Sequence, residues 1–191
     1  QGIYESDLVT FEGEFEDGYY KKGKEINKKT GVIEEGEFNQ NENLHGYGKR
    51  STPSVTHEGF FKNGLLHGKI TSKWPDGAYF EGEYSEGIEE GFGKMAWPDG
   101  EYYEGEWKMG DYEGKGVYQY GSGLKYEGEF VNGEWEGEGI IYYENGTTCE
   151  GELKNGFKHG YGREDYLTGN IYEGNHTVSY THLRAHETSI D

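Results

Sequence analysis

Glutamates in pairs, separated by one residue, are the first candidates for chemistry in this chain. Glu81 and Glu83 form one such pair, and Glu104 and Glu106 form another. Residues two apart share a face of a strand, so each pair could present two carboxylates, as a glycosidase acid and base do. The pair recurs in copy after copy of a repeated segment, however, whereas an active site needs one asymmetric constellation. We interpret the glutamates as a solvated face and predict no catalytic residue and no enzymatic activity.

Histidine and cysteine could instead bind a metal. His45, His67 and His159 each precede a Gly-x-Gly motif or its remnant, where other copies have Glu90, Glu113 and Glu136. Because histidine and glutamate exchange at one position, a shared surface role explains them better than ligation, and successive copies are too far apart for one ion. Cys149 stands where other copies have an aromatic residue, so we interpret it as a packing residue. We predict no metal and no cofactor.

A sequence repeat determines the secondary-structure elements that carry these residues. The pattern Tyr-Glu-Gly-Glu-Trp at Tyr103 to Trp107 has a Glu-Gly step that returns every 23 residues, eight times in all. The steps are Glu12-Gly13, Glu35-Gly36, Glu58-Gly59, Glu81-Gly82, Glu104-Gly105, Glu127-Gly128, Glu150-Gly151 and Glu173-Gly174. Such regularity predicts a repeat array in which one small unit is stacked on itself.

Each unit reads as a β-hairpin. Residues Phe80 to Tyr84 and Gly91 to Trp97 alternate with period two, and Gly-containing turn dipeptides such as Asp99-Gly100 bound the runs. No window shows the apolar stripe of a helix. The predicted fold class is all-β: an elongated single-layer antiparallel sheet of stacked 23-residue β-hairpins.

Aromatic residues must supply most of the core, since they make up 16% of the chain and all hydrophobic residues together only 31%. Equivalent aromatic residues of successive repeats form columns, and the glycine of the Glu-Gly step lies between two of these columns. The glycine lacks a Cβ, so an aromatic ring can lie flat on the main chain. The opposite face carries an acidic column that includes Glu81, Glu104, Glu127 and Glu150.

Three segments follow from the pattern. Residues 1–10 form an N-terminal edge, residues 11–176 form the array of about seven full repeats plus a partial eighth, and residues 177–191 form a non-repeat tail that resembles a cloning adaptor. The first two repeats are degenerate, since Glu34 and His57 stand where Phe80 and Tyr103 stand in later copies. They therefore form a cap or a specialised surface.

Charge limits the partners. The chain has 18 basic and 37 acidic residues, a net charge of −19, which argues against binding nucleic acid over the whole surface. A single cysteine and no visible signal peptide favour a cytoplasmic location. We expect other proteins as partners.

The unit resembles the MORN repeat (membrane occupation and recognition nexus). The resemblance covers about residues 11–176 and is best at Phe80 to Gly100, Tyr103 to Gly123 and Tyr126 to Gly146, and weaker at Cys149 to Gly169. It implies a non-catalytic scaffold or targeting module, cytoplasmic and associated with a membrane or the cytoskeleton. It also leaves open a regulatory segment of a larger enzyme, of the phosphoinositide kinase or lysine methyltransferase type. A carbohydrate-binding solenoid is a further alternative.

Two surfaces are candidates for binding. An aromatic face could hold a partner protein or a second copy of the array, through Trp74, Trp97, Tyr120, Tyr143 and Tyr166. A lysine cluster could bind anionic lipid of a phospholipid membrane, through Lys21, Lys22, Lys24, Lys28 and Lys29.

Overall fold

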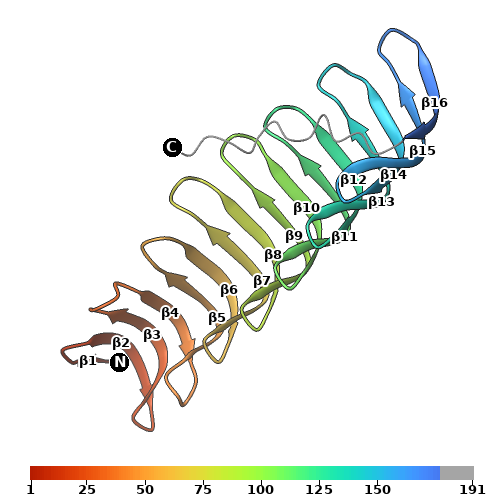
Figure 1. Ribbon diagram of the computed structural model, residues 1–191. Helices are drawn as coiled ribbons and strands as arrows, with labels where there is room; N and C mark the ends of the chain where they lie inside the picture. Colours follow the sequence, from red (N-terminus) through yellow and green to blue (C-terminus); the bar gives the residue numbers. More distant parts are fainter. Residues whose placement is uncertain (177–191) are drawn as a thin grey trace. The chain divides into compact units, whose positions relative to one another are not determined.

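The computed structural model describes residues 1–176, and every regular element among them is a β-strand. The chain divides into two compact units, Gln1–Pro98 and a second that begins at Asp99. Within each unit the strands form a single antiparallel layer and are hydrogen-bonded in chain order (Figure 1). The predicted all-β fold of stacked hairpins is confirmed. The described part of the chain contains no helix suited to spanning a bilayer.

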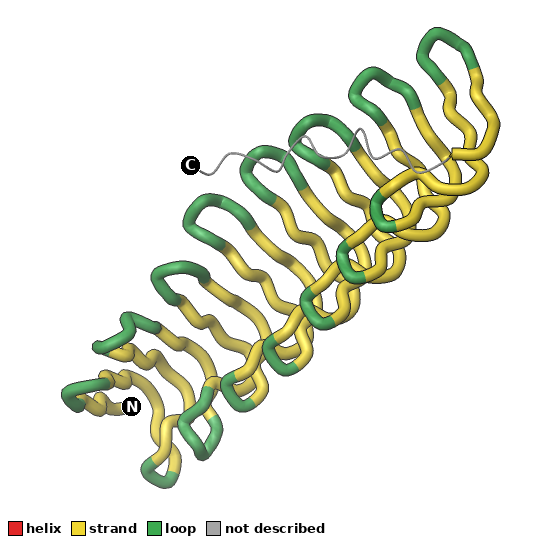
Figure 2. Tube along the Cα trace, in the orientation of Figure 1, coloured by secondary structure: helices red, strands yellow, loops and turns green. Residues whose placement is uncertain are grey.

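The strands are short and evenly spaced along the chain, and Figure 2 shows them alternating with brief loops. The first unit contains β1 (Gly2–Glu5), β2 (Val9–Glu16), β3 (Tyr19–Asn27), β4 (Ile33–Phe38), β5 (Leu44–Ser51), β6 (Thr56–Lys62), β7 (Leu65–Lys73), β8 (Tyr79–Ser85) and β9 (Ile88–Ala96). The second contains β10 (Tyr102–Lys108), β11 (Asp111–Gln119), β12 (Lys125–Val131), β13 (Glu134–Tyr142), β14 (Thr148–Lys154), β15 (Phe157–Asp165) and β16 (Ile171–His176).

Two kinds of turn connect the strands of a repeat. Between β10 and β11, Met109 and Gly110 have φ values of 54° and 86°, which is the left-handed pair that a two-residue type I′ hairpin requires. Between β11 and β12, the Tyr120 amide donates to the Leu124 carbonyl at 2.8 Å, and the Gly123 amide donates to the Tyr120 carbonyl at 3.0 Å. These two turns set the 23-residue interval.

A β-bulge bends each hairpin of the second unit near its middle. Gly105 pairs with Gly116, but the next residue, Glu106, pairs with Glu113, so β11 carries two additional residues. Gly114, which has a φ of 60°, lies in this bulge. The first glycine of the Gly-x-Gly motif is therefore needed for its left-handed backbone.

The second glycine of the motif serves a different purpose. A Cβ placed on Gly139 would lie 2.4 Å from Cε2 of Tyr126, because that ring covers the glycine on the neighbouring strand. The Tyr126 hydroxyl then donates to the Glu129 carbonyl at 3.0 Å, next to the bulge. The sequence pattern predicts a ring lying flat on a glycine, but it assigns that role to the glycine between the aromatic columns, here Gly128. The structure lays the ring over Gly139 on the neighbouring strand and brings the hydroxyl end of Tyr126 against Gly128.

Ring stacking completes the core without a second layer. Tyr126 is fully buried, stacks on Trp135 at 4.4 Å between centroids, and meets the edge of Phe130 at 5.2 Å. In the first repeat Phe11 stacks on Tyr20 at 3.8 Å in the same way. Such pairs add about 0.5–1.5 kcal/mol beyond the area they bury.

The second and third copies, which carry Glu34 and His57 in place of the first aromatic residue, have polar contacts on the same face. Arg50 on β5 pairs with Glu34 on β4 at 2.5 Å. His57 Nδ1 lies 2.8 Å from Ser72 Oγ, which in turn lies 3.2 Å from the Tyr84 hydroxyl. Ser72 is fully buried, so its hydroxyl depends on these partners.

The structure describes the N-terminal end of the array, whereas the tail after residue 176 is not described. Strand β1, within the segment 1–10 that we set apart as an edge, pairs with β2 and places Gly2 opposite Gly13. The tail 177–191 lies outside the described residues. Its predicted separation from the array stays a prediction.

Candidate functional site

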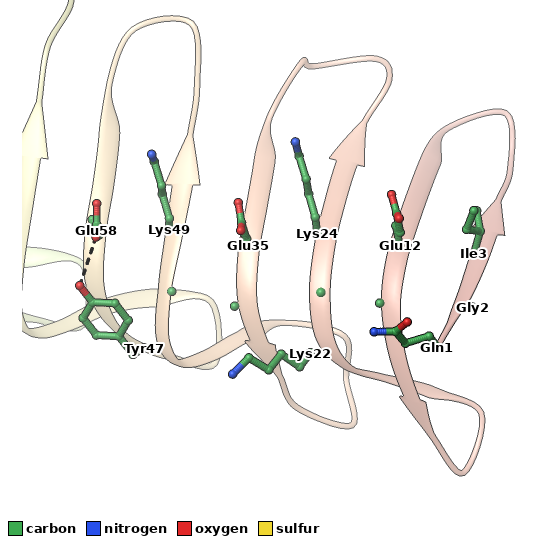
Figure 3. A pocket seen from close by; sticks show the side chains of 14 residues that line it. Gln1, Gly2, Ile3, Glu12, Lys22, Lys24, Glu35, Tyr47, Lys49 and Glu58 are labelled. Atoms are coloured by element: carbon green, nitrogen blue, oxygen red, sulfur yellow. Dashed lines mark hydrogen bonds between the residues drawn. The ribbon is translucent and has the colours of Figure 1, made fainter.

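A ladder of alternating charges crosses the first unit on the face opposite the aromatic rings. The register of neighbouring strands places five side chains opposite one another in turn: Glu12, Lys24, Glu35, Lys49 and Glu58. All five are exposed, and they lie in a row in Figure 3. Lys24 and Lys49 form no ion pair with any residue that the structure describes. The predicted acidic column is thus interrupted in this ladder by one lysine from β3 and one from β5.

Beside this ladder runs a groove of about 880 Å³. Its floor is a row of glycines that are cross-strand partners from β1 to β5, namely Gly2, Gly13, Gly23, Gly36 and Gly48. Lys22 and Tyr47 line the groove together with the charge ladder. The groove therefore combines main chain along its floor with charged side chains at its edge.

An exposed aromatic pair adjoins this groove. Tyr47 and Phe60 are direct cross-strand partners, 58% and 53% exposed, with ring centroids 5.6 Å apart and planes at 84°. The Tyr47 hydroxyl donates to Glu58 at 3.2 Å, which raises the pKa of the phenol and ties the ring to the ladder. Exposed tyrosine and phenylalanine rings are enriched at protein interfaces. We name this pair and the five ladder residues the charged groove.

Our sequence reasoning missed this pair. The available signal was an aromatic residue in the middle position of Gly46-Tyr47-Gly48, a position that points away from the packed rings. Phe92 and Tyr161 occupy the same middle position in other repeats and are each 58% exposed.

The five rings of the predicted aromatic face are mostly half-buried in the structure. Each of the five residues directly follows the second strand of a hairpin and begins the next turn. Two lie in the first unit and three in the second: Trp74, Trp97, Tyr120, Tyr143 and Tyr166. The first four are half-buried and Tyr166 is 41% exposed. Burial raises the pKa of Tyr120 to about 12, helped by Glu101 and Glu134. A binding role for these rings stays a prediction.

The predicted lysine cluster is dispersed. Lys21 pairs with Glu16 at 3.0 Å, and Lys28 pairs with Glu5 at 2.9 Å. Lys22 lies 4.0 Å from Glu37, whereas Lys24 belongs to the charge ladder and Lys29 lies in the turn after β3. The structure does not bring the five ammonium groups together, and lipid binding by them stays a prediction.

The repeated glutamates and histidines have local partners. Glu106 accepts a hydrogen bond from the Lys115 amide in the bulge at 3.1 Å. Glu113 accepts one from the amide of Asn132 in the next hairpin turn at 3.1 Å, and His45 accepts the equivalent bond from Asn63 at 3.3 Å. Glu113 and His45 thus accept the same kind of bond at this position of the repeat. His67 and His159 each bury Nδ1 without a hydrogen-bond partner in the described part.

The fold and this face define a single-layer β-hairpin repeat protein with a charged groove. The model of the MORN repeat matches five consecutive segments, 57–79, 80–102, 103–125, 126–148 and 149–171. The chain therefore belongs to the MORN repeat family. No curated protein sequence matches it at a significant level.

Solved structures match this chain at low sequence identity. The E1021V mutant of the TCP10 domain of Danio rerio CPAP matches with a TM-score of 0.51 and 12% identity, over 92% of this chain and 83% of that one. The TCP domain of Drosophila melanogaster SAS-4 (dCPAP), in complex with a proline-rich motif of Ana2 (dSTIL), matches with a TM-score of 0.49 and 8% identity, over 85% and 86%.

Proposed function

We propose that this chain is a non-catalytic scaffold that binds other proteins, and that the charged groove of the first unit is its binding surface. The observation that carries the proposal is the exposed Tyr47–Phe60 pair beside an alternating ladder of charges. This combination has the anatomy of an interface, with an aromatic anchor and a polar rim.

The spacing of the ladder favours a helical partner that lies across the strands. Neighbouring strands are about 4.8 Å apart, and one turn of an α-helix rises about 5.4 Å. Over the four steps from Glu12 to Glu58 the mismatch grows to about 2.4 Å. Long side chains absorb that difference. An extended peptide repeats on one face every 6.7 Å or so, and it would be out of register by roughly 8 Å.

The alternation also argues against an anionic lipid surface as the ligand of this groove. Each ladder lysine lies between two glutamates, so a layer of headgroups with one sign of charge would be attracted and repelled in turn. A partner helix with acidic and basic residues on successive turns matches both signs.

A display library of helical peptides tests the proposal. Selection on the parent protein should enrich peptides with charges that alternate every turn and one apolar residue for Tyr47. The charge-swapped variant Lys24→Glu/Glu35→Lys should enrich the inverse charges at the corresponding turns. Tyr47→Ala should weaken selected peptides about tenfold or more, as an interface anchor does. Lys115→Glu on the same face of the second unit is the matched control and should leave binding unchanged.

The proposal is wrong if the parent enriches no peptide family, or if the swapped variant selects the same charges as the parent. Fluorescence anisotropy on the selected peptides, at low and high salt, separates ladder charges from the aromatic anchor. Only the charge contribution should weaken with salt.

A further inference from the structure

The last three strands bring together a cysteine, a glutamate and a histidine. Cys149 on β14 pairs with Glu164 on β15, and His176 is the last residue of β16. The sulfur, one carboxylate oxygen and one imidazole nitrogen all lie within 4.8 Å of one another. These atoms are three different ligand types that Zn²⁺ accepts in proteins.

Each of the three side chains replaces an apolar one. The residues 23 positions earlier are Tyr126, Ile141 and Leu153, and all of them are buried in the core of the preceding repeat. Three donors thus occupy adjoining positions whose counterparts one repeat earlier are apolar core positions. Four repeats earlier the same three positions hold the hydrogen-bonded side chains of His57, Ser72 and Tyr84, so polar groups at these positions occur elsewhere in the array as well.

The side chains of the cluster are largely shielded from solvent. Cys149 is 4% exposed and Glu164 is 8% exposed. His176 Nδ1 lies 3.9 Å from Glu164 Oε1, and its Nε2 is buried with no hydrogen-bond partner among residues 1–176.

Lys158 currently satisfies the carboxylate. Its ammonium group donates to Glu164 Oε1, and the Tyr166 hydroxyl donates to Oε2. The same ammonium lies 5.4 Å from the centroid of the Tyr143 ring. Lys158 is therefore an internal cation at the position that a metal ion would share, and the two compete for Glu164.

We propose that Cys149, Glu164 and His176 form a zinc site that fastens β14, β15 and β16 together at this end of the array. Thiolate and imidazole suit Zn²⁺ and exclude Mg²⁺ and Ca²⁺, which prefer oxygen ligands. Donor atoms around tetrahedral zinc are about 3.5 Å apart, so the three donor atoms must move closer together by roughly 1 Å when zinc binds. Binding releases the thiol proton to solvent as the Zn–S bond forms, and a water completes the coordination.

Metal titration of the full chain, stripped of metal with a chelator, tests the site. Co²⁺ should produce a thiolate-to-cobalt charge-transfer band in the near ultraviolet together with the intense visible bands of tetrahedral cobalt. Zn²⁺ should displace this signal and raise the melting temperature, whereas Mg²⁺ should do neither. Zinc binding should also weaken as pH falls, because the thiol must lose its proton.

Variants assign the signal to the cluster. Cys149→Ser should abolish the charge-transfer band, and His176→Gln should weaken Zn²⁺ binding at least tenfold. Lys158→Met should tighten it, because the competing cation is gone. His159→Gln changes a neighbouring histidine outside the cluster and should bind as the parent does. Circular dichroism of each apo variant shows whether it is folded, and His176→Gln carries the test if Cys149→Ser is not.

The inference is overturned if Co²⁺ gives no charge-transfer band with the parent. It is equally overturned if zinc stabilises His176→Gln as much as the parent, since that would indicate loose binding to the acidic surface. The groove proposal is independent of this result, because its residues belong to the first unit.

Discussion

The ring of Tyr103 lies over Gly116 on the neighbouring strand, so that a Cβ on Gly116 would come within 2.6 Å of Tyr103 Cε2. The Tyr103 hydroxyl reaches past the glycine and donates to the Glu106 carbonyl at 2.7 Å. The glycine, the ring and the bulge therefore form one packing unit. Tyr126 and Gly139 repeat it one hairpin later.

Gly116→Ala should destabilise the protein by about 1–3 kcal/mol, because the new methyl group overlaps the ring. Tyr103→Ala alone should cost about 3–5 kcal/mol. In the Tyr103→Ala background the alanine at position 116 should cost at least about 1 kcal/mol less, since the overlap is gone. Urea denaturation followed by tryptophan fluorescence measures all four proteins, and strictly additive losses would contradict the direct contact.

Stability should fall in alkaline solution. Burial raises the pKa of Tyr126 to about 12, and Tyr20, Tyr112 and Tyr120 are raised to about 12 as well. An unfolded tyrosine ionises near pH 10. The folded state holds these protons more tightly, so the stabilisation is complete below about pH 10 and is lost as pH rises towards about 12.

The free energy of unfolding measured between about pH 9 and about pH 12 should decline by up to about 1.4 kcal/mol per pH unit for each buried phenol. Tyr126→Phe removes one titrating group and should give a shallower decline. A flat profile over this interval would contradict the assignment of these hydroxyls to the folded core.

Met109→Asn should stabilise the second unit. Met109 has a φ of 54° and is 70% exposed, whereas Asn132 and Asn155 occupy the same turn position in later hairpins at φ 49°. Asparagine tolerates the left-handed region better than a long side chain does. The expected gain is about 0.5–1 kcal/mol in urea denaturation. The reverse substitution, Asn132→Met, should lose a similar amount, and equal stability of both variants with the parent would refute the strain.

Arg50→Met should destabilise the first unit by about 1–3 kcal/mol, because it leaves the half-buried Glu34 carboxylate without its partner. Glu25, whose pKa burial raises with help from Glu34, lies opposite that carboxylate and adds to the repulsion. The double variant Arg50→Met/Glu34→Leu should recover much of the loss. If the double variant is less stable than Arg50→Met alone, the ion pair is not what stabilises this face.

Short-range features were the ones that residue order alone could predict. The 23-residue interval is written directly in the sequence, and the Met109-Gly110 and Asp99-Gly100 turns depend on adjacent residues. The ring over glycine joins the two strands of one hairpin, as Tyr103 and Gly116 do. The MORN resemblance rests on the same local pattern, which the family match then confirms.

The charged groove and the cysteine–glutamate–histidine cluster depend instead on the pairing register of neighbouring strands. Lys24 and Lys49 come to lie between glutamates, and Tyr47 beside Phe60, only because the register of the paired strands decides which residues face each other. Cys149, Glu164 and His176 stand on three successive strands, so no motif of a single hairpin links all three. A hairpin is specified by its own few residues, whereas the neighbours of a side chain across strands are fixed only when the whole layer has paired.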